Sequence, residues 1–254
     1  MEETLRILVA LGLGGLLILL RLEAERFGTA EYDEPGGPGG PGVFLRVGWY
    51  AIGGALIAGI LLVAPDPDEL FLLSLGDRLP AILLGFVFGA LGVAQAAVWA
   101  WYRYGRFRWP PLEDYPWAAI NSVLTALIDE AAFRGVLLGL LLVTGLEPWI
   151  AVVIQTLVYT LATRTGASGR SRYLLGLSLV YGLVGGWLTV LTGGIGAAFI
   201  AHATTRFSGF VLTGHVGHSL ARGAEAEEVL AGRLPPRGWR VIGRERRGSS
   251  SRDG

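Results

Sequence analysis

The stretch ALIDEAAFRG (126–135) decides how this chain is interpreted, because it places three charged residues inside an apolar run. Asp129, Glu130 and Arg134 lie within WAAINSVLTALIDEAAFRGVLLGLLLVTG (117–145), which otherwise has the hydrophobicity of a lipid-embedded segment. An ionisable residue near the centre of a bilayer costs about 2.5–3.5 kcal/mol on insertion scales, so it normally faces the interior of a helix bundle. The stretch therefore predicts a membrane protein with a polar interior.

The composition of the whole chain agrees with this interpretation. Of its 254 residues, 52% are hydrophobic and only 17% are charged, and the mean hydropathy is +0.51. A soluble domain of this length would carry more charge. The net charge is zero, so no nucleic-acid partner is expected. The absence of cysteine excludes disulfides and thiolate metal sites. We expect a multi-pass protein of the cell membrane, with the lipid bilayer as its surroundings.

The apolar segments predict an all-α, polytopic transmembrane helix bundle of about seven spans. The spans are expected at 4–20, 43–64, 80–102, 117–144, 147–163, 173–192 and 195–213. Arg-rich and Arg-poor loops alternate between them, with Arg21, Arg26 and Arg46 counted at the edges of the first loop. By the positive-inside rule, the N-terminus is expected outside and the C-terminus in the cytoplasm.

Three parts of the chain are expected from these patterns. Residues 1–42 form an N-terminal span followed by a Pro/Gly-rich linker, EPGGPGGPG (34–42). Residues 43–213 form the transmembrane bundle. Residues 214–254 form a polar, Arg-rich cytoplasmic tail.

Polar residues follow helical spacing on three of the expected spans. Glu130 and Arg134 are i,i+4 neighbours and can pair on one helix face. Further positions at spacing four are Asn121, Thr125 and Asp129 on the same span, Gln155, Tyr159 and Thr163 on 147–163, and His202 and Arg206 on 195–213. Packing these three polar faces against one another would satisfy the hydrogen-bonding groups of each face. The glycines at 182, 185 and 186 would allow the helices to approach closely.

These residues resemble the CAAX protease and bacteriocin-processing family of intramembrane peptidases. DEAAFRG (129–135) is similar to the family's first motif, Glu-Glu-x-x-x-Arg. YTLAT (159–163) lies where the family has Phe-x-x-x-His, and HATTR (202–206) where it has His-x-x-x-Asn. The resemblance extends over about residues 80–213.

The resemblance implies a water-filled pocket that opens into the membrane and a membrane-embedded peptide or protein as substrate or partner. A first-motif acid would activate water, and histidines would position the water and stabilise the oxyanion. The catalytic residues implied are Asp129, Glu130, Arg134 and His202. The remaining motif positions, at the wall of the pocket, are Tyr159, Thr163 and Arg206.

Three of these positions depart from the family pattern. Asp129 replaces a glutamate, Thr163 replaces a histidine and Arg206 replaces an asparagine. Threonine cannot change its charge near neutral pH as histidine can. An arginine beside a carboxylate makes it a poorer base. If Arg134 and Arg206 meet the two acids, the group becomes a neutral, buried ion cluster.

Two functions therefore stay open at this point. The first is an intramembrane endopeptidase that uses Asp129 or Glu130 as base and His202 to polarise the scissile carbonyl, without a covalent intermediate. The second is a catalytically degenerate relative, a partner-binding or immunity-type protein in which the charges form a structural cluster. A transporter is a third class, but the chain has no internal repeat.

No cofactor or metal is expected. His202, Asp129 and Glu130 could together contact an ion, but they lack the second histidine of a good site, and Arg206 would repel a cation. His215 and His218 form an i,i+3 pair at the end of the last span, where histidines are usually solvated.

Overall fold

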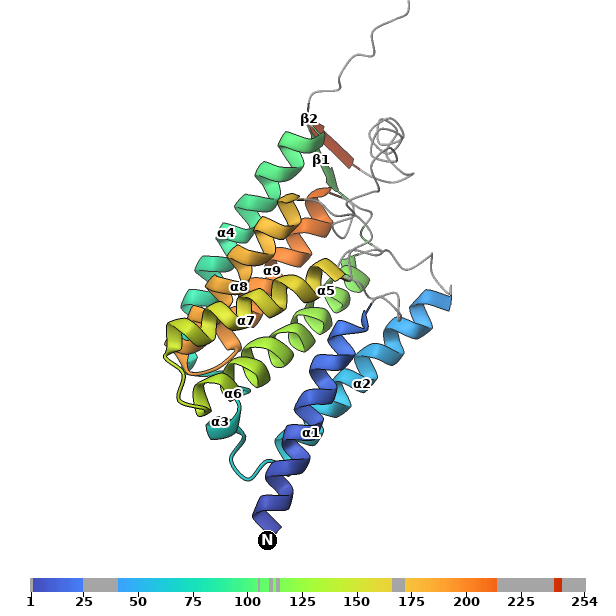
Figure 1. Cartoon of the computed structure of the whole chain (residues 1–254). Helices are drawn as coiled ribbons and strands as arrows, with labels where there is room; N and C mark the ends of the chain where they lie inside the picture. The colour runs from blue at the N-terminus through green and yellow to red at the C-terminus, as the bar shows by residue number, and fades with distance from the viewer. Residues whose placement is uncertain are drawn as a thin grey trace, which may run out of the picture.

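The computed structural model describes residues 2–24, 41–104, 106–109, 112, 115–165, 172–213 and 240–243. They form a bundle of helices with a short β-ribbon at one end (Figure 1). The long helices are α1 (Glu2–Leu22), α2 (Pro41–Val63), α4 (Arg78–Tyr104), α5 (Tyr115–Glu130), α7 (Pro148–Thr165), α8 (Arg172–Thr192) and α9 (Gly196–Thr213). The short elements are α3 (Pro67–Leu70), the π-helix η3 (Ala131–Leu137), α6 (Leu138–Val143), β1 (Arg106–Trp109) and β2 (Arg240–Gly243).

The expected all-α membrane bundle is confirmed. Each of the seven predicted spans falls on a long helix, and the span 117–144 falls on the continuous run of α5, η3 and α6. Among the described residues, α1, α2, α4 and α8 contain segments long and apolar enough to cross a bilayer. The protein is therefore a multi-pass membrane protein. The number of spans and the orientation of the termini stay predictions.

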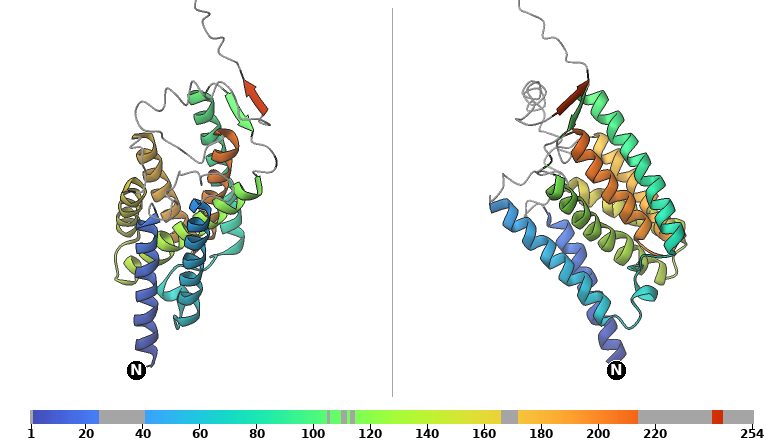
Figure 2. Two further views of the ribbon diagram at one scale, coloured as in Figure 1. Left: turned by 90° about the vertical axis from the view of Figure 1, so that its right-hand side faces the viewer. Right: turned by 180° about the vertical axis from the view of Figure 1, so that it is seen from behind.

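Helix α5 occupies the middle of the bundle and carries the charged stretch. It packs against α9, α2 and α1, while α4 packs along α9 and α7 along α8. Figures 1 and 2 show α1 and α2 side by side on one flank and α4 on the opposite flank. Residues from α1, α5, α7, α8 and α9 can thus meet inside the bundle.

Two arginines that were counted for the first loop are buried in the bundle. Arg21 and Arg46 are each only 2% exposed. Assigning them to a loop was wrong, because a basic residue at the end of an apolar run looks the same in sequence whether it points to solvent or inward. Of the loop's other predicted features, Arg26 and the linker up to residue 40 lie outside the described residues.

A β-ribbon joins the tail to the segment after α4. Strands β1 and β2 are antiparallel, with Arg106 opposite Gly243 and Trp109 opposite Arg240. Phe107 and Trp109 pack on a small apolar cluster of α4 and α9. The sequence did not predict these strands, since each is four residues long. The rest of the predicted tail, with His215 and His218, lies outside the described residues.

Glycines allow the connection before α4 to contact the turn between α8 and α9 directly. The amide of Ile195 donates to the carbonyl of Ser74 at 2.9 Å, and that of Asp77 donates to Thr192 O at 2.7 Å. Gly76 has φ +72°, and a Cβ there would lie 2.3 Å from Thr192 O. This contact fixes the start of α9 relative to α4.

We expect Gly76→Ala to destabilise the protein more than Gly145→Ala. Both glycines have positive φ, which costs a non-glycine residue about 1–2 kcal/mol. Only at Gly76 would the added methyl also meet backbone, because the space around Gly145 is open to 4 Å. Thermal unfolding of the two variants in the same detergent measures the difference. Equal melting temperatures would contradict the close contact.

Candidate active site in the membrane bundle

The charged stretch lies at the junction of α5 and η3. Asp129 and Glu130 are the last residues of α5, and Arg134 lies within the π-helical segment that follows. π-Helical segments are rare and occur frequently at functional sites. The carbonyl of Gly135 accepts from the amide of Leu72 at 3.1 Å, and a Cβ on Gly135 would lie 2.4 Å from the Leu73 side chain. The segment after α3 therefore packs closely over the widened helix.

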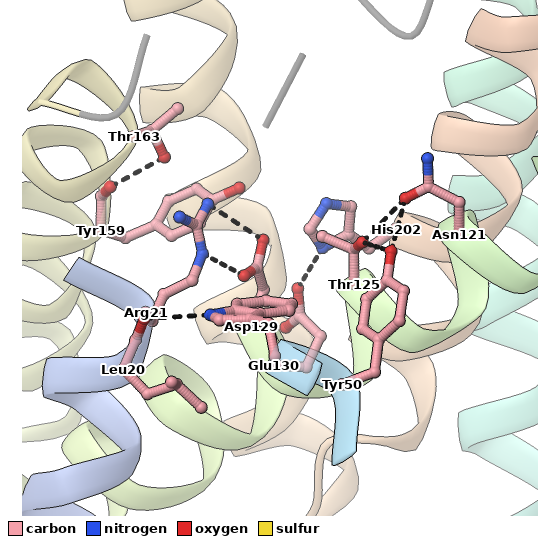
Figure 3. A network of polar contacts seen from close by, with 11 residues as sticks. Leu20, Arg21, Tyr50, Asn121, Thr125, Asp129, Glu130, Tyr159, Thr163 and His202 are labelled. Carbon is pink, nitrogen blue, oxygen red and sulfur yellow. Dashed lines mark hydrogen bonds and ion pairs between the residues drawn. The ribbon is translucent and has the colours of Figure 1, made fainter. Parts of the chain in front are cut away.

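Asp129 is paired with Arg21 of α1. The Arg21 Nε contacts Asp129 Oδ1, and its Nη2 lies 3.4 Å from Oδ2, so both carboxylate oxygens face one guanidinium (Figure 3). Asp129 is 0% exposed and Arg21 is 2% exposed. A bidentate pair of this kind suits the planar fork of arginine. The sequence did not assign Arg21 to the site. Its one signal is the face that it shares with the buried residues Ala10, Gly14 and Leu17.

Glu130 contacts two residues on two different elements. Its Oε2 lies 3.3 Å from Arg134 Nε, and its Oε1 lies 2.7 Å from His202 Nδ1. The predicted i,i+4 pair of Glu130 and Arg134 is thus confirmed. The contact with His202 joins the first and third motifs across α5 and α9, and Figure 3 shows the two side chains pointing toward each other.

Arg134 is enclosed on all sides and is 1% exposed. Its Nη2 donates to the carbonyl of Tyr181 at 3.1 Å, and its Cζ lies 4.1 Å from the centre of the Tyr159 ring. Gly185 makes room for the guanidinium, because a Cβ there would lie 3.1 Å from Arg134 Nε. The predicted close approach at the α8 glycines is therefore present.

A second polar group ties α2 to α5. The Tyr50 hydroxyl donates to Asn121 Oδ1 at 2.8 Å and lies 3.1 Å from Thr125 Oγ1. Thr125 also donates to Asn121 Oδ1 at 3.1 Å. The predicted polar stripe on α5 is therefore buried and hydrogen-bonded. Tyr50 was missed by the sequence analysis, because one tyrosine in an apolar span has no spacing signal.

The second- and third-motif positions are arranged differently from one another. Thr163 is buried, and its hydroxyl donates to the Tyr159 carbonyl of its own helix at 3.0 Å. Tyr159 is also buried and packs edge-on against Phe133 at 5.3 Å. Arg206 is half-buried and interacts electrostatically with Tyr50. Asp129 pairs with Arg21 of α1, a residue that the expected cluster of Asp129, Glu130, Arg134 and Arg206 did not include.

Within the described part of the chain, no group of three His, Cys, Asp or Glu side chains is arranged to hold a metal ion. The site brings together two carboxylates, their arginine partners and one imidazole.

Comparison with known families identifies the part of the chain that carries these residues. Residues 111–208 match the family described as type II CAAX prenyl endopeptidase, Rce1-like. The resemblance seen in the sequence is confirmed. The match covers less than half of the chain but contains all three motifs. No curated protein and no solved structure matches the chain.

The CAAX-protease-like region begins just before α5 and ends within α9. Helices α1, α2 and α4 precede it. From outside the matched region, Arg21 reaches the motif residue Asp129, and Tyr50 reaches Asn121 and Thr125. The protein is a membrane protein with a CAAX-type protease-like region that its N-terminal helices contact.

Proposed function

We propose that the protein is an intramembrane endopeptidase in which Glu130 and His202 activate the hydrolytic water. The supporting observation is the 2.7 Å contact between Glu130 Oε1 and His202 Nδ1. A structural ion pair would need only Arg134 to neutralise Glu130. The additional imidazole, on another helix and 6% exposed, supplies a second ring nitrogen that can act as a general base.

The two carboxylates take different roles in this mechanism. Asp129 has both oxygens against Arg21 and serves to position α1 on α5. Glu130 is also beside an arginine, and it serves best to hold a proton on His202 Nδ1. His202 Nε2 then carries the lone pair that acts as base. This assigns Glu130 and Arg134 to positioning and His202 to catalysis.

Hydrolysis proceeds without a covalent enzyme intermediate. His202 Nε2 takes a proton from water as the water oxygen attacks the scissile carbonyl carbon, and the carbonyl electron pair moves onto oxygen. Arg206, one helical turn beyond His202, supplies positive charge for this oxyanion in place of the family's asparagine. The imidazolium then gives its proton to the amine as the C–N bond breaks. The substrate is a peptide segment within or beside the membrane.

The test compares membranes of cells that express wild type, His202→Gln and Ser208→Ala at matched levels. His202→Gln removes the base without changing the charge of the site, and Ser208 is a buried residue of the same helix that the mechanism does not use. New peptide termini near membrane spans are scored. General-base catalysis typically contributes about 10²–10⁴-fold. We expect wild type and Ser208→Ala to produce the same new termini. In His202→Gln, the amount of these termini should fall at least a hundredfold. Unchanged termini in that variant would refute the proposal.

A second candidate function is supported by the Arg21–Asp129 pair and Thr163. The first-motif acid is neutralised by an arginine, and the position of the second-motif histidine carries a hydroxyl bonded to its own helix. These changes suit a partner-binding protein without peptidase activity. This second function predicts that membranes containing the wild-type protein have the same peptide termini as membranes of cells that do not express it. The wild-type protein should still accumulate.

A further inference from the structure

Helix α7 buries polar groups that have no hydrogen-bond partner. Gln155 is 0% exposed, Thr156 2% and Thr160 4%. Both amide atoms of Gln155 and both threonine hydroxyls are without a partner. None of these residues belongs to the motifs or to the mechanism above. A buried polar group without a partner is costly, so it indicates a polar ligand at that position.

The two threonines differ from the other buried helical threonines that the structure describes, each of which has a hydrogen bond; Thr125 donates to Asn121 Oδ1. Thr163, Thr189 and Thr192 each donate to the carbonyl four residues earlier, at 2.8–3.0 Å. This local bond is the usual way to satisfy a threonine hydroxyl inside an apolar helix. Thr156 and Thr160 do not make it, although the same carbonyl position is available to a helical residue. Their hydroxyls are therefore available to bind a group outside their own helix.

The unpartnered groups are contiguous with the site. Gln155, Thr156 and Thr160 lie within about 140° of one another on α7, at 100° per residue. This face meets the glycines of α8: a Cβ on Gly182 would lie 2.6 Å from Thr156, and one on Gly186 3.0 Å from Gln155 Oε1.

Arg134 extends the set toward Glu130. Its Nη1 is also buried without a hydrogen-bond partner. Arg134 lies against Gly185, the neighbour of Gly186 on α8, and under the ring of Tyr159, one turn beyond Gln155. The polar face of α7 thus ends at the guanidinium that pairs with Glu130.

We propose that the interface between α7 and α8 binds a file of water molecules from Thr160 to Arg134. The charge of Arg134 is already matched by Glu130, so an ion is not favoured. The other groups include both donors and acceptors, which is the combination that water satisfies and that a lone anion or cation does not. A buried water needs two to four polar partners, and this face supplies them. The role of this file rests on the proposed function. The file replaces the one water molecule that is consumed for each peptide bond cleaved at Glu130 and His202.

The absence of cysteine allows a direct test by single-cysteine labelling in native membranes. Thr156→Cys and Thr160→Cys are compared with Ala151→Cys, a 0%-exposed apolar position of α7 that lies off this face, and Leu157→Cys, 51% exposed on its outer side. The probe is a small charged methanethiosulfonate, which reacts with the thiolate and therefore needs water at the sulfur. We expect labelling at 156 and 160 at least tenfold faster than at 151 and 157. Equal rates at all four positions would overturn the proposal.

A second test uses a double variant and needs no labelling reagent. Thr156→Val with Thr160→Val replaces both hydroxyls by methyl groups of the same shape. If the interface binds water, the melting temperature falls, because the waters lose partners. If the interface is dry, it rises, because two unpaired hydroxyls are removed. Neither readout uses proteolysis. Labelling at 156 and 160 without any cleaved terminus would support the water file and refute the peptidase. Cleaved termini without labelling would support the peptidase and refute the water file.

Discussion

Replacing Arg21 with methionine is expected to lower the free energy of unfolding by about 3–5 kcal/mol, because it leaves the Asp129 carboxylate buried without its counter-ion. Asp129 is 0% exposed, so solvent cannot take the place of the guanidinium. Methionine keeps a long apolar stem against the neighbouring helices. The melting temperature of purified protein in detergent, together with its level in membranes, measures the loss. Arg6→Met is the matched control, since Arg6 lies on the same helix and is exposed.

Adding Asp129→Asn to Arg21→Met should restore most of the lost stability. The double variant removes both charges, and a buried ion pair replaced by neutral groups is often no less stable than the pair. If Arg21→Met alone behaves like Arg6→Met, Asp129 has another counter-ion, and Arg206 becomes the first residue to examine.

Spacing along the sequence predicted the parts of the site that lie on one helix or face one another. The i,i+4 relation of Glu130 and Arg134 needs only helical geometry, and it is found at 3.3 Å. The burial of Gln155, Tyr159 and Thr163 follows from the cost of polar groups in lipid. The helices themselves were predicted because about 20 apolar residues have few alternatives in a membrane.

The features that spacing could not predict depend on contacts between segments far apart in the chain. Arg21 is 108 residues from Asp129, and an arginine at the end of an apolar helix is equally suited to a membrane surface. The pairing of β1 with β2 joins residues on either side of the whole family-like region. The π-helix after Glu130 leaves no mark in the residue pattern, and neither does the hydrogen bond from Leu72, in the segment after α3, to its Gly135 carbonyl.

Replacing Arg134 with methionine is expected to cost about 3–5 kcal/mol as well, since Glu130 is 1% exposed and loses its guanidinium partner. The variant also removes the hydrogen bond to Tyr181 O and the contact with the Tyr159 ring. Adding Glu130→Gln should recover the part of the loss that comes from the unpaired charge. The part of the stability loss that comes from the missing contacts with Tyr181 and Tyr159 should persist. Rescue is therefore expected to be less complete than for Arg21 and Asp129.

Exchanging the rescuing partners decides whether the two pairs are separate. Asp129→Asn should not rescue Arg134→Met, and Glu130→Gln should not rescue Arg21→Met, because each acid faces its own arginine. The interaction free energy of each double variant, taken from melting temperatures of the four single and four double variants, gives the answer. Rescue in all combinations would mean one delocalised cluster in which neither acid has an arginine of its own. Rescue only within the pairs would leave Glu130 with His202 as a unit independent of Asp129, which is what the proposed water activation needs.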